Sequence, residues 1–135
     1  MTGSRFAIAV LLAASANATL AADPIPPQLV GVWATDGAVL KGQALFEGQA
    51  LYLGADGTGA VVGGPPPIGF RIVARFDAQT NQLEFDAYEG TQRGPHSALA
   101  VDPKAGTIDL GAPKHQLLHR RFDSFPEETR KALGL

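Results

Sequence analysis

The stretch from Leu51 to Tyr88 contains short apolar runs separated by turn sequences, and its central run, Phe70 to Asp77, alternates with a period of two. Between Phe70 and Phe76, aromatic or aliphatic residues occupy every second position, and Arg71 and Arg75 lie between them. This spacing is typical of strands that turn one face to a core and the other to water. We therefore predict an antiparallel β meander through this region.

One hairpin of the meander can be predicted residue by residue. The segment Asp77–Gln82 contains the Asp, Asn and polar residues that turns favour between two apolar runs. We expect Phe76 to lie opposite Leu83. This register places Arg75 opposite Glu84 on the solvated face, an ion pair worth roughly 0.2–1 kcal/mol. The interior face then carries seven side chains: Phe70, Ile72, Ala74, Phe76, Leu83, Phe85 and Ala87.

Further strands are expected on both sides of this hairpin. Asp56-Gly57 favours a tight turn after the apolar run that ends at Leu53. Ser124-Phe-Pro-Glu127 is a capping-box sequence that predicts a short C-terminal helix. Three later strands are predicted: His96 to Val101, Thr107 to Leu110 and His115 to Phe122. The fold class expected from these elements is all-β, with one short helix at the C-terminus.

The hexapeptide Gly42–Glu47 is followed by a near copy, Gly48–Leu53. Two copies are too few for a solenoid, which needs at least about three stacked repeats. A continuous strand would place Phe46 and Tyr52 on one face, although a glycine such as Gly48 often marks a bend. Chance or a local duplication explains the repeat without a function, and an aromatic ligand lining is the alternative.

Residues 1–21 have the features of a secretory signal peptide. Arg5 lies near the start, the apolar run Phe6–Ala16 follows, and Thr19-Leu-Ala21 is a small-residue cleavage site. The run is too short and too poorly flanked for a membrane anchor. We therefore expect a signal peptide over residues 1–21 and a single domain over residues 22–135. The localisation expected is periplasmic or secreted, with no membrane span after cleavage.

Net charge and cysteine content limit the classes of partner and metal site that the domain can have. Removal of residues 1–21 leaves 10 Lys and Arg against 13 Asp and Glu, a formal charge of −3. A weakly acidic domain without basic clusters argues against a nucleic-acid partner. The chain contains no cysteine, so disulfides and thiolate metal sites are excluded and stability must come from packing.

Residues that could carry chemistry do not form a recognisable catalytic site. Glu84 and Asp86 lie two apart on a predicted strand, with no third group to tune them. His115 and His119 have the spacing of a helical metal site, but on a strand their side chains would be about 13 Å apart. His96 next to Ser97 lacks both a nucleophile elbow and an orienting acid. We therefore predict no catalytic residues, no metal site, no cofactor and no enzymatic activity.

Gly31-Val32-Trp33 on an early strand, the meander and a basic last strand together resemble the lipocalin and wider calycin pattern. The resemblance implies an up-and-down barrel of about eight strands. It also implies that Trp33 and an arginine of the last strand, either Arg120 or Arg121, close one end. The family's Thr-Asp-Tyr motif is absent, and the short chain favours a barrel filled by its own side chains.

From this resemblance we expect a non-enzymatic, lipocalin-like domain that binds a small hydrophobic molecule. The residues predicted to line the ligand site in the barrel interior are Trp33, Tyr52, Phe70, Ile72, Phe76 and Phe85. The alternative is a module that binds an exported protein, such as an enzyme inhibitor or an immunity protein. That module would use the loop Gly63–Pro67 or the loop Gly90–Gly94.

Overall fold

The computed structural model describes residues 24–135. The predicted signal peptide and its cleavage site lie outside the described residues and stay predictions. Within residues 24–135, no helix is both long enough and apolar enough to cross a membrane.

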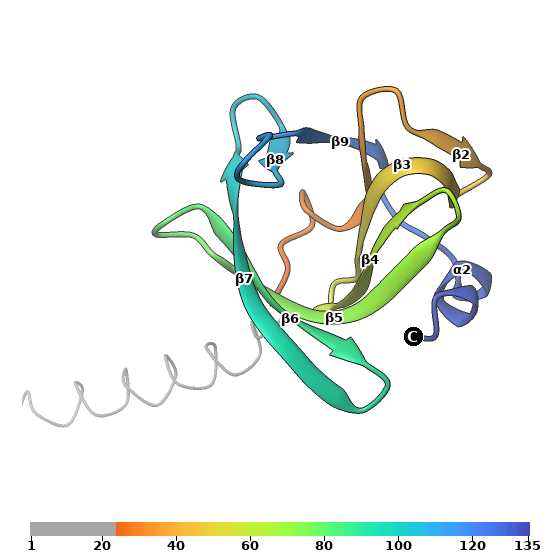
Figure 1. The fold of residues 1–135 in the computed structure, drawn as a ribbon. Helices are drawn as coiled ribbons and strands as arrows, with labels where there is room; N and C mark the ends of the chain where they lie inside the picture. The colour runs from red at the N-terminus through yellow and green to blue at the C-terminus, as the bar shows by residue number, and fades with distance from the viewer. Residues whose placement is uncertain (1–23) are drawn as a thin grey trace, which may run out of the picture.

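In this part of the chain, nine strands in one sheet are followed by one short helix (Figure 1). The elements are β1 (Gly31–Thr35), β2 (Val39–Lys41), β3 (Ala44–Leu53), β4 (Thr58–Gly64), β5 (Ile68–Asp77), β6 (Gln82–Glu89), β7 (Gln92–Asp102), β8 (Thr107–Asp109), β9 (Leu117–Phe122) and α2 (Glu127–Ala132).

Eight of these strands close into an antiparallel barrel. From β3 to β9 each strand pairs with the next along the chain, and β1 pairs with both β3 and β9, which closes the ring. Strand β2 lies outside the ring, beside the first half of β3 (Figure 1). The predicted fold class, an all-β up-and-down barrel with a short C-terminal helix, is confirmed.

The hairpin of β5 and β6 has the predicted register. Phe76 lies opposite Leu83, and Arg75 lies opposite Glu84. The Arg75 guanidinium donates to the Glu84 carboxylate at 3.0 Å. In the turn, the Asp77 carboxylate accepts two backbone N–H groups, which satisfies donors that the ladder leaves unpaired.

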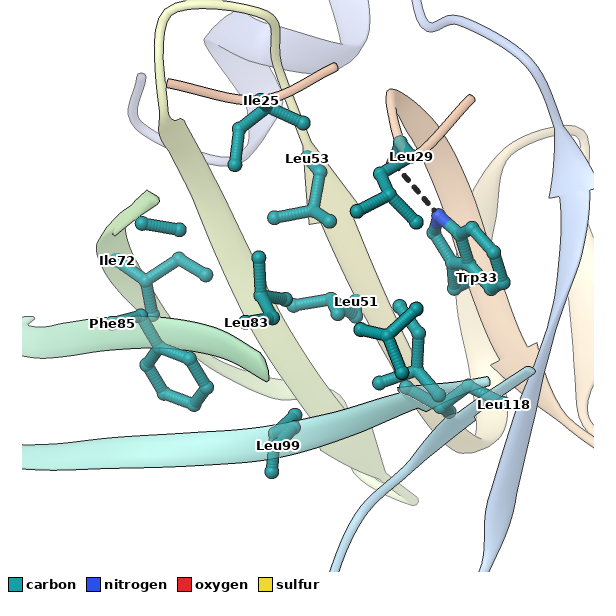
Figure 2. Close-up of a cluster of buried hydrophobic side chains, with 13 residues drawn as sticks. Ile25, Leu29, Trp33, Leu51, Leu53, Ile72, Leu83, Phe85, Leu99 and Leu118 are labelled. Carbon is teal, nitrogen blue, oxygen red and sulfur yellow. Dashed lines mark hydrogen bonds between the residues drawn. The ribbon is translucent and has the colours of Figure 1, made fainter. Parts of the chain in front are cut away.

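Apolar side chains from strands around the ring fill the barrel interior (Figure 2). Two residues of the segment before β1, Ile25 and Leu29, complete this core from one end. Each fully buried large side chain contributes roughly 1.5–3 kcal/mol to folding, so this cluster is the main source of stability. Its buried members are Ile25, Leu29, Trp33, Leu51, Leu53, Ile72, Ala74, Leu83, Phe85, Leu99, Val101, Ile108 and Leu118.

A second apolar cluster lies on the outer face of β1, β3 and β4, where the C-terminal segment and residues from β2 pack against it. Tyr52 belongs to this outer cluster, with its ring edge-on to Phe125 at 5.8 Å and its hydroxyl donating to the Gln43 carbonyl. The interior position predicted for Tyr52 is therefore wrong. Leu51 and Leu53 take the inward positions of β3, so the residue between them points outward.

Strand β3 changes face at Gly48. Leu45 and Tyr52 are an odd number of residues apart, yet both belong to the outer cluster. Gly48 has a φ of 105°, and a Cβ there would lie 2.9 Å from the Ala38 Cβ. Phe46 is consequently 44% exposed, under the ammonium of Lys41, and does not share an aromatic face with Tyr52.

Candidate functional site

A pocket of about 450 Å³ lies at the end of the barrel where β1 begins. We call it the Trp33 pocket. The segment before β1, the β5–β6 turn, the β7–β8 turn and one residue of β9 enclose it. Its apolar wall consists of Leu29, Trp33, Phe76, Ala78, Val101 and Pro103. Its polar side chains are Gln28, Asn81, Asp102 and Arg120.

Trp33 forms the inner wall of this pocket. Its side chain is 2% exposed, and its indole N–H donates to the Leu29 carbonyl at 3.0 Å (Figure 2). The buried indole donor is therefore satisfied, as a buried tryptophan requires. The same bond fixes the segment before β1 across the barrel end, so the wall of the pocket is preformed.

Arg120 holds that segment from the other side. It lies opposite Trp33 in the pairing of β9 with β1. Its Nε donates to the Val30 carbonyl at 3.0 Å, and its Nη2 donates to the Pro27 carbonyl at 2.9 Å. Of the two arginines left open by the resemblance, Arg120 lies beside Trp33. Arg121 lines a different hollow, formed in part by residues from the end of β1.

Gly31 is required where β9 ends against β1. Its φ is 137°, and a Cβ there would overlap the carbonyl oxygen of Phe122. A side chain at this position would push β9 away from β1, together with Arg120. The spacing of Gly31 and Trp33 therefore has a packing reason at this end of the barrel.

The other residues predicted to line a ligand site separate into three places. Phe76 lines the Trp33 pocket together with Trp33. Ile72 and Phe85 are buried in the filled interior. Phe70 is 43% exposed near the opposite end of the barrel. The short strand β8 pairs with only three residues of β7, Ala100 to Asp102, so it does not extend to that end. The prediction that Phe70 is an interior residue is wrong, because no strand covers it there.

Sequence reasoning missed the turn residues of the pocket. Ala78 and Asn81 belong to the β5–β6 turn, Asp102 is the last residue of β7, and Pro103 begins the β7–β8 turn. The turn predicted at Asp77–Gln82 is confirmed. The two turns come together only because the barrel closes, so no local sequence pattern indicated that they share a pocket.

A charged cluster covers the outer face of β5, β6 and β7. Nδ1 of His96 lies 2.9 Å from the Asp86 carboxylate, and its Nε2 lies 3.3 Å from Glu84. Arg93 pairs with Asp86 at 3.0 Å. The hydrogen bond from His96, with the nearby charge of Arg93, lowers the pKa of the Asp86 carboxyl below its ordinary value. The cluster lies on the solvated face of the sheet, where Glu84, Asp86 and His96 also line a hollow of about 290 Å³. The expectations that no third group lies near Glu84 and Asp86 and that His96 has no orienting acid are therefore wrong.

His115 and His119 do not share a site. His115 lies in the β8–β9 connection, with its Nδ1 3.1 Å from the Asp109 carboxylate. His119 lies on β9, beside the hollow that Arg121 lines. Across residues 24–135, no three side chains of His, Cys, Asp or Glu are grouped to hold a metal ion.

Comparisons with models of protein families, with curated proteins and with solved structures found no match to this chain. The eight-strand antiparallel barrel with one additional strand is consistent with a lipocalin-like barrel. Membership of that family stays a prediction.

Proposed function

We propose that this protein is an exported, non-enzymatic, lipocalin-like domain that binds a small, mainly apolar molecule in the Trp33 pocket. The observation that carries the proposal is the pocket itself. Its volume of about 450 Å³ lies within the roughly 300–1,000 Å³ of typical small-molecule sites. Six apolar residues and a few convergent polar groups line it, which is the composition such sites share.

The position of the site follows from the packing. Apolar side chains from strands around the ring pack together in the barrel interior (Figure 2). At the end where β1 begins, Trp33 and Phe76 of this interior line the pocket together with residues of two turns. A ligand there contacts the core without displacing it.

The lipocalin-like assignment is supported by three features at this end. Gly31 and Trp33 lie on the first strand of an up-and-down barrel, and Arg120 from its last strand fixes the chain before β1. Export is supported by the sequence of residues 1–21, which lies outside the described part.

Trp33 is the only tryptophan of the chain, so its fluorescence reports on this pocket alone. Titration with the neutral apolar dye N-phenyl-1-naphthylamine should quench Trp33 by energy transfer, with a sub-millimolar dissociation constant. Ala78→Phe fills part of the pocket and should weaken dye binding about tenfold. Thr80→Phe, in the same turn but outside the pocket lining, should leave it unchanged. Dye binding that is absent, or equal in all three proteins, would contradict the proposal.

A second candidate function is binding of an exported protein, favoured by the opposite end of the barrel. Ile68 is 62% exposed and Phe70 is 43% exposed. They lie at the end of the barrel that carries the β4–β5 and β6–β7 turns, where the predicted loops Gly63–Pro67 and Gly90–Gly94 partly belong to strands β4 and β7. Two hollows there, of about 440 and 370 Å³, both include Phe70. Exposed apolar side chains beside hollows often mark protein interfaces.

This candidate has its own test. If an exported partner binds this end, the double variant Ile68→Ser, Phe70→Ser should lose co-purification of that partner, whereas Ala78→Phe should retain it. Retention by the double variant, or loss in Ala78→Phe, would count against a partner at this end.

A further inference from the structure

We infer that the molecule bound in the Trp33 pocket is an apolar carboxylic acid whose carboxylate is held by Arg120. This inference rests on the proposed function and names the class of ligand.

The guanidinium of Arg120 is fixed in place by backbone oxygens alone. Nε and Nη2 donate to the carbonyls of Pro27, Val30 and Asp123. No carboxylate of residues 24–135 lies within 4.0 Å of it, so its positive charge has no ion-pair partner there. Backbone carbonyls orient the group and leave its full charge available to a ligand.

Nη1 is the part of the guanidinium that remains for recognition. Nη1 makes no hydrogen bond to any residue of the described chain, whereas Nε and Nη2 both donate to backbone carbonyls. Arg120 lines the Trp33 pocket. A guanidinium binds carboxylates through charge-assisted hydrogen bonds, and its fixed position means that little side-chain entropy is lost on binding.

The other charged side chain of the pocket is Asp102, and its carboxylate already accepts hydrogen bonds from the protein. Its Oδ1 accepts the N–H groups of Lys104 at 3.0 Å and Ala105 at 3.1 Å, within its own turn. These bonds explain its position without a ligand. The pocket therefore offers one cation without a partner, beside an apolar wall that includes Trp33 and Phe76. An aromatic or aliphatic body on that wall, with a carboxylate toward Arg120, matches this arrangement.

The test compares two ligands of nearly the same shape, of which one carries a carboxylate and the other a neutral amide. 1-Naphthylacetate and its neutral amide, 1-naphthylacetamide, compete with N-phenyl-1-naphthylamine while Trp33 fluorescence is recorded. The acid should bind about tenfold more tightly than the amide at low salt, because it alone forms charge-assisted bonds. The preference should shrink as salt is added.

Three variants test whether Arg120 is responsible for the preference for the acid. Arg120→Gln should abolish the preference for the acid, and Arg121→Gln, the same change at the neighbouring residue, should keep it. Because Arg120→Gln removes bonds that hold the barrel end, Asp102→Asn provides a readout that leaves Arg120 intact. It keeps an oxygen for the turn and should raise the affinity for the acid roughly two- to fivefold, with the amide unchanged.

The outcomes separate the two proposals. Equal binding of acid and amide would overturn the inference and leave the proposed function standing. Tighter binding of 2-(1-naphthyl)ethylamine than of the acid would also overturn it, because Asp102 would then recognise the ligand. If neither the dye nor any naphthyl compound affects Trp33, the proposed function fails, and this inference fails with it.

Discussion

Adjacent arginines of β9 have different surroundings, and this difference shows how single residues define the barrel end. The guanidinium of Arg120 donates to carbonyls of the segment before β1. Arg121 lies at a different hollow and makes none of these bonds. Alternation alone does not decide between them, because the register of β1 with β9 shifts between Val32 and Trp33. The sequence therefore predicted the pair of candidates but not which one faces Trp33.

Replacing each arginine by lysine tests this difference. Arg120→Lys should lower the free energy of unfolding by roughly 1–3 kcal/mol, because an ammonium cannot reproduce the planar set of bonds to several carbonyls. Arg121→Lys, which keeps the charge in the same way, should change it by less than about 0.5 kcal/mol. Urea denaturation measures both, and similar losses in the two variants would refute the role assigned to Arg120.

Asp86 makes the stability depend on pH in a defined direction. Its folded-state pKa is held below the ordinary value of 3.8, first by the His96 hydrogen bond and then by Arg93. A carboxyl with a lowered folded pKa stabilises the folded protein above the unfolded pKa, and this contribution is lost as the pH falls through the lower folded value. Asp86→Asn should therefore reduce the loss of stability below about pH 4.

Thermal unfolding at pH 7, 4 and 3 measures this effect. The drop in melting temperature between pH 7 and pH 3 should be smaller in Asp86→Asn than in the unmodified protein. Glu47→Gln is a suitable control, because Glu47 forms no ion pair with any residue in the part of the chain that the structure describes. An equal drop in all three proteins would contradict the assignment.

Among the elements, the β5–β6 hairpin could be predicted and β3 could not. In the hairpin, apolar residues occupy every second position, charged residues fill most of the positions between them and the turn is polar, so both local signals give one register. In β3, Leu51, Tyr52 and Leu53 are all buried, because one face meets the barrel core and the other meets β2 and the C-terminal segment. Such a run carries no alternation, so the face of Tyr52 depends on tertiary packing.

Gly48 sets the bend of β3, and two glycine variants test its contribution. Gly48→Ala should cost roughly 2–4 kcal/mol, since its φ of 105° is unfavourable for a side chain and the new Cβ would lie 2.9 Å from that of Ala38. Gly42 also has a positive φ, 60°, but no atom lies within 4 Å of the Cβ that Gly42→Ala would add. Gly42→Ala should therefore lower the free energy of unfolding by only about 1–2 kcal/mol. Urea denaturation giving equal costs would show that the bend does not depend on space at Gly48.

For the whole molecule, the closed barrel was predictable and the pocket was not. Alternating strands joined by short turns indicated a meander, and the resemblance carried by Gly31, Trp33 and the basic last strand implied its closure into a barrel. The Trp33 pocket combines segments near residues 28–33, 76–81, 101–106 and 120, which only the closed ring brings together. Its apolar wall combines three strand residues, Trp33, Phe76 and Val101, with three residues outside the strands, Leu29, Ala78 and Pro103.

The central claim is that a small apolar molecule binds at the end of the barrel where β1 begins and that the filled interior takes none. Chemical-shift mapping of ¹⁵N-labelled protein with 1-naphthylacetamide tests this claim most directly. The account predicts that the largest shifts occur at the Trp33 indole N–H and at the backbone amides of Ala78, Asn81 and Gly106. Shifts centred instead on Phe70 and Ala87 at the opposite end, or no shifts at any amide, would contradict it.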